Sequence, residues 1–87
     1  MENLNDYRAR LDAIDKDMVA LFEARMHMAY EIGRYKKAQG LPVLDEKREA
    51  EKLEKVSELV KDKNLEGEIR KFYQYLMERS RNAQNEL

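Results

Sequence analysis

Arg25 is a charged residue at a position where the pattern of the chain predicts an apolar one. Around it, apolar residues recur at alternating steps of three and four, which predicts one face of a long helix. An unpaired cation in an apolar setting is costly, so Arg25 is expected either to pair with a carboxylate or to bind an anion. We call the apolar residues of this face the seam: Leu4, Tyr7, Leu11, Ile14, Met18, Leu21, Met28, Ile32 and Tyr35.

Other polar residues are spaced so that they could join Arg25. Lys36 follows eleven residues later, which in a helix places it about 16 Å along the axis and only about 20° around it. Long side chains from these two positions could lean over one small ligand. Asp45, Arg48 and Glu49 fall within about one turn of a second helical segment, so their side chains share a face.

Ser80 and Gln84 interrupt the apolar stripe of a third helical segment. Taken singly, each polar residue has a simpler explanation. Arg25 could fix the register of packed helices with Glu49 or another carboxylate as its partner, Lys36 could lie in solvent, and the hydroxyl of Ser80 could bond back to the preceding turn. Taken together, they predict a cavity for a small polyanion, or for a reaction that needs charge stabilisation without a nucleophile.

Other kinds of site have less support in the sequence. His27 is the only histidine, it lies off the seam, and there is no cysteine, so neither a metal nor a disulfide is expected. No glycine-rich phosphate loop is present and no base is placed to activate a serine, so no cofactor is expected. The net charge of −1 argues against binding to nucleic acid or to an anionic membrane. We expect a soluble, cytoplasmic protein.

The 87 residues predict a single all-α domain, spanning residues 1–87, with helices at about 3–39, 45–61 and 65–86. Gly40 suits a left-handed helix end, and Asp45 and Asn64 are the expected N-caps. The first helix would be about 55 Å long, whereas a compact chain of this length has a radius of gyration of about 12 Å. We therefore expect either a dimer with long helices side by side or an elongated hairpin.

These features resemble the all-helical chorismate mutases, a three-helix type that forms an intertwined homodimer. The resemblance covers essentially the whole chain, through "YRARLDAIDKDMVALFEAR", "MAYEIGRYKKAQGLPVLDEKRE" and "FYQYLMERSRNAQ". It implies an isomerase of the shikimate pathway and aromatic amino-acid biosynthesis, which converts chorismate to prephenate. That rearrangement is unimolecular and needs no cofactor, metal or nucleophile.

The resemblance also implies a role for each polar residue. Arg8 and Arg25 would bind the two carboxylates of chorismate. Lys36 and Gln84 would donate hydrogen bonds to the ether oxygen, where negative charge develops. The remaining residues would hold the ring hydroxyl (Glu49 and the backbone around Asp45), assist a carboxylate (Ser80) and support the site (Arg48).

Helix geometry constrains how Arg8 can take part. Arg8 and Arg25 are about 25 Å apart along a straight helix and about 100° apart around it. If both bind one chorismate, Arg8 must come from the other subunit, so the sites of the homodimer would be shared. Two alternatives stay open: an isochorismate-pyruvate lyase of the same fold, and a non-catalytic helical dimerisation module.

Overall fold

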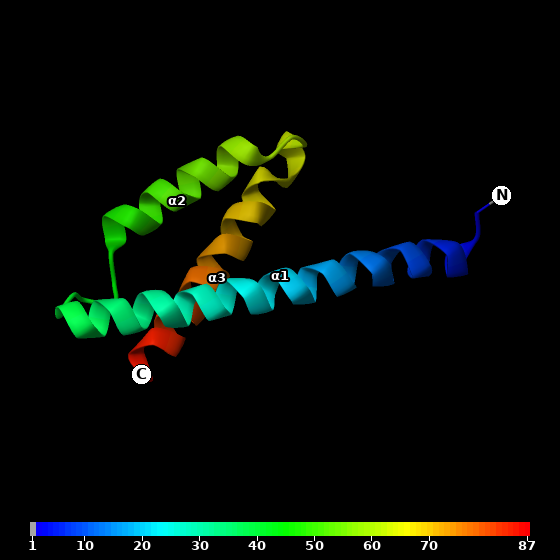
Figure 1. Cartoon of the computed structure of the whole chain (residues 1–87). Coiled ribbons are helices and arrows are strands. Elements are labelled where there is room, and N and C mark those ends of the chain that lie inside the picture. Colours follow the sequence, from blue (N-terminus) through cyan, green and yellow to red (C-terminus); the bar gives the residue numbers. More distant parts are fainter. Residues whose placement is uncertain (1) are drawn as a thin grey trace.

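The structure is a computed structural model that describes residues 2–87 as three α-helices joined by short connections (Figure 1). α1 spans Leu4–Gln39, α2 spans Glu46–Leu59 and α3 spans Glu66–Asn85, with a short 3₁₀ turn, η1, at Lys63–Leu65. The all-α class predicted from the sequence, with three helices of which one is long, is confirmed.

Both ends of α1 are capped by local interactions. Asn3 Oδ1 accepts a hydrogen bond from the backbone N–H of Asp6, and Asp6 Oδ2 accepts one from the N–H of Asn3, both at 3.0 Å. This reciprocal capping box satisfies donors that the first turn of a helix leaves free. At the other end Gly40 has φ 67°, as expected for a left-handed helix end that favours glycine.

α2 begins where the sequence predicts, but its end and the connection to α3 differ from the prediction. Asp45 caps α2 as expected, because its Oδ1 accepts from the backbone N–H of Arg48 at 3.0 Å. α2 then ends at Leu59, two residues before the predicted end. The prediction of Asn64 as an N-cap is wrong: Asn64 lies inside η1, and its N–H donates to Asp62 Oδ1 at 3.1 Å. An aspartate readily accepts from the N–H two residues on, and here that local turn competes with a direct helix start.

α3 packs on both other helices, whereas α1 and α2 do not pack on each other. Figure 1 shows α3 crossing the C-terminal half of α1, where Ala29 and Gly33 are buried. The buried core also contains Val56 of α2 and Leu76 and Met77 of α3. α3 is therefore the element that sets the distance between α1 and α2.

The seam of α1 is uncovered in the single chain. Tyr7, Leu11 and Ile14 are each 55% exposed, because they lie on the N-terminal half of α1, beyond the C-terminal half that α3 crosses (Figure 1). The radius of gyration is 16.4 Å, against about 12 Å for a compact chain of this length. The exposed surface is 7206 Å², against roughly 5,400 Å² for a compact monomer of this mass.

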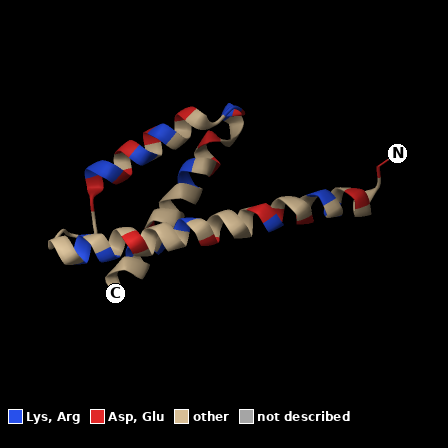
Figure 2. Cartoon of the chain, viewed as in Figure 1, with Lys and Arg blue, Asp and Glu red and all other residues tan. Residues whose placement is uncertain are grey.

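Charged residues are spread along all three helices, and basic and acidic residues alternate along α2 (Figure 2). The chain has a net charge of −1, so any anion site depends on the local placement of cations. Within residues 2–87, no helix combines the length and the apolar character needed to cross a membrane.

Candidate active site

A cavity of about 300 Å³ lies between the three helices and contains most of the polar residues singled out in the sequence. Its volume is at the lower end of the range for small-molecule sites. The lining combines apolar side chains with charged, hydroxyl and amide groups. The lining residues are Arg25, Met28, Ala29 and Ile32 of α1, Arg48, Glu49 and Lys52 of α2, and Met77, Ser80 and Gln84 of α3.

Arg25 is half-buried and is held by α3. Its Nη1 donates to Ser80 Oγ at 2.9 Å, and that hydroxyl donates in turn to the carbonyl of Leu76 at 3.0 Å. The guanidinium also lies 5.7 Å from the centroid of the Tyr73 ring, within cation–π range. Across residues 2–87 no carboxylate lies within 4.0 Å of the guanidinium. Arg25 is thus oriented by neutral groups, and its guanidinium remains available to bind an anion.

Glu49 does not pair with Arg25 within the chain, so the prediction of Glu49 as the partner of Arg25 is wrong. Glu49 instead binds Arg81 of α3, whose Nη1 donates to both carboxylate oxygens, at 2.6 Å to Oε2. The two side chains are only 26% and 30% exposed. Arg81 therefore neutralises the single carboxylate of the cavity wall, and the cations that line the cavity stay uncompensated.

Gln84 is positioned by the close approach of α1 and α3. Its Nε2 donates to the carbonyl of Ala29 at 2.8 Å, which leaves the second N–H of the amide available. The approach requires Gly33, since a Cβ on that residue would lie 2.7 Å from Cγ and 3.2 Å from Cβ of Gln84. An isolated glycine inside a helix destabilises it by about 1 kcal/mol relative to alanine, so this residue marks a packing constraint.

If the cavity is a catalytic site, we expect Gly33→Ala to lower turnover by about tenfold or more while leaving the protein helical. Cβ of Gln84 is next to the backbone, so α3 must shift and carry the amide away from Ala29. Turnover and circular dichroism measure the two effects. Gly67→Ala is the matched control, and it should keep parental turnover. Beyond the neighbouring residues and the backbone of its own helical turn, the added Cβ would have no atom of residues 2–87 within 4 Å. Parental turnover in Gly33→Ala as well would mean that the Gln84 position is not needed.

Lys36 and Asp45 lie outside this cavity. Both line a neighbouring hollow, whose other lining residues are Leu41, Pro42, Leu44 and Glu46. The Nζ of Lys36 donates to the backbone carbonyl of Val43 at 2.9 Å, and the side chain is half-buried. Lys36 thus lies at the junction of α1 with the loop that leads to α2, and its ammonium keeps two further donors.

Arg8 is separate from both hollows. It lies on the N-terminal half of α1, which is exposed throughout and extends beyond the rest of the chain (Figure 1). Arg25 is about 25 Å away along the same helix. Within one chain, Arg8 and Arg25 cannot bind the same small ligand.

The positive charge gathered around the cavity affects the pKa of Lys52. Burial lowers the pKa of its ammonium, and the positive charges of Arg48, Lys55 and Arg25 lower the pKa further. Each of these effects disfavours the charged form of lysine. The cavity therefore has an excess of positive charge in the absence of a ligand.

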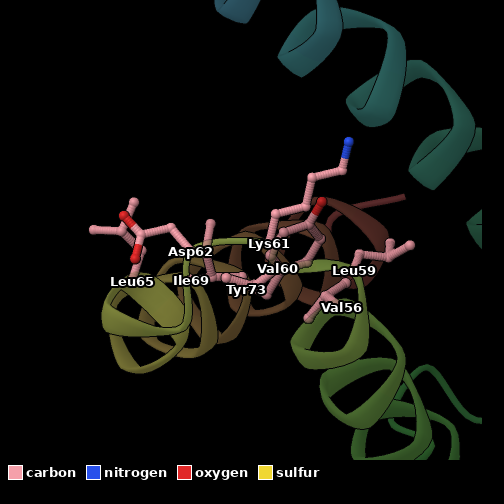
Figure 3. Close-up of a pocket in the computed structure, with 8 residues that line it drawn as sticks. All are labelled: Val56, Leu59, Val60, Lys61, Asp62, Leu65, Ile69 and Tyr73. Atoms are coloured by element: carbon pink, nitrogen blue, oxygen red, sulfur yellow. The ribbon is translucent and has the colours of Figure 1, made fainter.

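Two apolar hollows lie on other faces. One is lined by Val56, Leu59, Val60, Lys61, Asp62, Leu65, Ile69 and Tyr73. Figure 3 shows these side chains gathered where α2 meets α3, with Lys61 projecting away from the group. The other lies between α1 and α3 and is lined by Met18, Leu21, Phe22, Arg25, Phe72, Tyr73 and Leu76. Their apolar lining suits contact with another apolar surface rather than with a polyanion.

The sequence matches a known family over nearly its whole length. The family model described as chorismate mutase type II matches residues 7–85. The chain belongs to the type II chorismate mutase family. This match confirms the resemblance found in the sequence and the enzyme class, an isomerase, that the resemblance implies.

Two curated proteins are similar to this chorismate mutase family member. A chorismate mutase of Methanocaldococcus jannaschii is 28% identical over 87 residues, which cover 99% of this chain and 88% of that protein. The T-protein of Haemophilus influenzae is 35% identical over 49 residues, which cover 56% of this chain but only 13% of the T-protein. The similarity to the first protein thus extends over both chains, whereas the second match is confined to a small part of a much longer protein.

In this type II chorismate mutase chain, the structure brings five of the eight predicted site residues into one cavity. They are Arg25, Arg48, Glu49, Ser80 and Gln84. Lys36 and Asp45 line the adjacent hollow, and Arg8 is remote. Sequence analysis missed Gly33 and Lys52, and it assigned no role to Arg81, which follows Ser80. The mid-helix glycine was a usable signal, and so was the spacing of Lys52, three residues after Glu49 and four after Arg48.

Proposed function

We propose that this protein rearranges chorismate to prephenate in the cavity between the three helices, and that a second subunit completes each site. The observation that carries the proposal is Arg25, a half-buried guanidinium that neutral groups orient and that has no carboxylate partner among residues 2–87. A planar fork of donors held in this way suits a substrate carboxylate. The family gives the substrate, which is a dicarboxylate enol ether.

Catalysis would rest on restraint and on charge stabilisation. In the rearrangement a carbon–carbon bond forms while the ether carbon–oxygen bond breaks within the same molecule, so no proton has to move. Arg25 would fix one carboxylate and so favour the compact conformer in which the two ends meet. The free N–H of Gln84 would donate to the ether oxygen as negative charge develops there.

Lys36 would supply the second donor to the ether oxygen. Its Nζ lies on the carbonyl of Val43, and rotation about the side-chain bonds of a lysine can direct the ammonium toward the neighbouring cavity. Glu49 would accept a hydrogen bond from the ring hydroxyl, while its ion pair with Arg81 holds the carboxylate in place. The backbone near Asp45, the Ser80 hydroxyl and Arg48 would complete the binding of substrate.

The intertwined homodimer is the assembly that best accounts for the uncovered surfaces. The seam runs along α1 with every apolar member exposed, and two apolar hollows flank α3. The surface in excess of a compact monomer is of the size that a stable dimer buries. A second copy that lays its seam along this one would cover these surfaces and bring its own Arg8 toward the cavity.

The direct test is incubation of the purified protein with chorismate and, separately, with isochorismate. We expect chorismate to be consumed and prephenate to form without release of pyruvate. Pyruvate released from isochorismate, with chorismate unchanged, would identify a lyase of the same fold. No reaction with either substrate would identify a non-catalytic helical module.

We expect Gln84→Glu to make the activity acid-dependent. The amide donates, whereas an ionised carboxylate only accepts and would repel both the ether oxygen and the Ala29 carbonyl. Activity should therefore be low at neutral pH and rise as the pH falls through the pKa of the introduced carboxyl. The measurement is kcat against pH from about 4 to 8, a range that spans ordinary and raised carboxyl pKa values. A pH profile as flat as that of the parent would remove Gln84 from the site.

A further inference from the structure

Lys52 is a cation of the cavity that the family resemblance leaves without a role. It is half-buried on the face of α2 that carries Arg48 and Glu49, and it lines the cavity with them. Within residues 2–87 it makes no side-chain hydrogen bond and no ion pair. A lysine that served only the fold would be expected to find a carboxylate or to extend into solvent.

The charges that face Lys52 show why it has no partner. Arg25 faces it from α1, and Arg48 and Lys55 flank it on α2. Glu49 is the only carboxylate that lines the cavity, and Arg81 already binds both of its oxygens. The part of α3 that lines the cavity adds only the neutral side chains of Met77, Ser80 and Gln84. Lys52 thus lies among like charges, in a place that favours a bound anion.

We propose that Lys52 is a substrate-binding residue whose ammonium takes a carboxylate of chorismate on the α2 side of the cavity, across from Arg25. This inference rests on the proposed function. The dicarboxylate would be held from two helices, so the ligand itself would tie α2 to α1, which do not otherwise pack on each other. A carboxylate within hydrogen-bond reach favours the charged ammonium, which offsets the repulsion from the neighbouring cations.

The pH dependence of binding follows from the direction of the pKa shift. Because burial and the adjacent cations lower the pKa of Lys52, its proton is lost at a lower pH than that of an exposed lysine. Affinity for a dicarboxylate should therefore decline with rising pH before ordinary lysines titrate. An arginine at this position stays charged throughout that range, so Lys52→Arg should bind the ligand and shift the alkaline decline to higher pH.

The test compares Lys52→Gln with Lys47→Gln. Both variants remove one positive charge from α2, but Lys47 is exposed and does not line the cavity. The probes are chorismate in steady-state kinetics and prephenate, the dicarboxylate product, in calorimetric titration. For Lys52→Gln we expect KM for chorismate and Kd for prephenate to rise about tenfold, with kcat within about twofold, because a contact made equally in ground and transition states changes KM alone. Lys47→Gln should stay within about twofold of the parent in all three values.

Each outcome decides the matter. Parental KM and Kd in Lys52→Gln, in a protein that still turns over chorismate, would overturn the role of Lys52 and leave the proposed function intact. Equal losses in Lys52→Gln and Lys47→Gln would reduce the effect to net charge and would also overturn it. If the parent neither binds prephenate nor consumes chorismate, the proposed function fails and this inference fails with it. An alkaline decline that Lys52→Arg does not move would assign that decline to another group, and the pH argument would be wrong.

Discussion

Replacing Lys36 with alanine should lower kcat by a factor of about 100 to 1,000, the usual effect of removing one donor aimed at developing charge. The effect on folding should be much smaller. The side chain makes one hydrogen bond, to the carbonyl of Val43 at 2.9 Å, and a bond to a charged donor contributes about 1.5–3 kcal/mol when buried and less at a half-exposed position. Steady-state kinetics and thermal denaturation measure the two losses separately.

Lys37→Ala is the matched control for this prediction. It removes the same kind of side chain one residue further along α1, where the Nζ of Lys37 donates to the carbonyl of Leu87 at an exposed position. The control should keep kcat within about twofold, because a surface contact of this kind contributes little. A kcat within threefold of the parent for Lys36→Ala would contradict the assignment of Lys36 as a donor to the ether oxygen.

Two inactive variants, Arg8→Ala and Lys36→Ala, should regain activity when they are unfolded together and refolded as a mixture. The reason is the position of Arg8 on the exposed half of α1, about 25 Å from Arg25 along the helix. If each site takes Arg8 from one chain and Lys36 from the other, a mixed dimer has one site with both lesions and one site with neither. Random pairing makes half of the dimers mixed, so about a quarter of all sites should be intact.

Chorismate turnover before and after the joint refolding gives the result, and mass measurement of the mixed dimers shows that exchange has occurred. Each variant refolded alone is the control and should stay inactive. If every site came from a single chain, each site in the mixture would keep one lesion. No recovery in the presence of mixed dimers would therefore mean that Arg8 serves its own chain, or that the intertwined dimer is wrong.

The helices could be predicted because their limits are set by local chemistry. Gly40 stops α1 through a backbone conformation that other residues avoid, and Asp45 starts α2 through its own side chain. The error at Asn64 has a local origin too, since Asp62, two residues earlier, can also cap and does so for the turn η1. The seam was recognised by its period, but periodicity cannot tell which apolar line meets α3 and which is left for another chain.

The candidate site was predictable where a polar residue interrupts an apolar stripe. Arg25 and Gln84 are conspicuous for that reason, and both line the cavity. Lys52 was missed, and Arg81 was left without a role, because 40% of the chain is charged. Another lysine or arginine on a charged helix therefore carries no signal by residue type. The partner of Glu49 depends on how α3 is rotated against α2, and that angle is a property of packing rather than of spacing.

The unbroken course of α1 has a consequence for how the enzyme tolerates change. In the proposed dimer, one rod of helix carries Arg8 for one site and Arg25 for the other, with no loop between them to absorb a shift. A single residue inserted between them would turn Arg8 by about 100° around the axis and advance it by about 1.5 Å. Outside the seam, the segment from Arg8 to Arg25 should therefore accept many exchanges of side chain over evolutionary time but almost no change of length, since the pitch of the helix fixes the position of one site relative to the other.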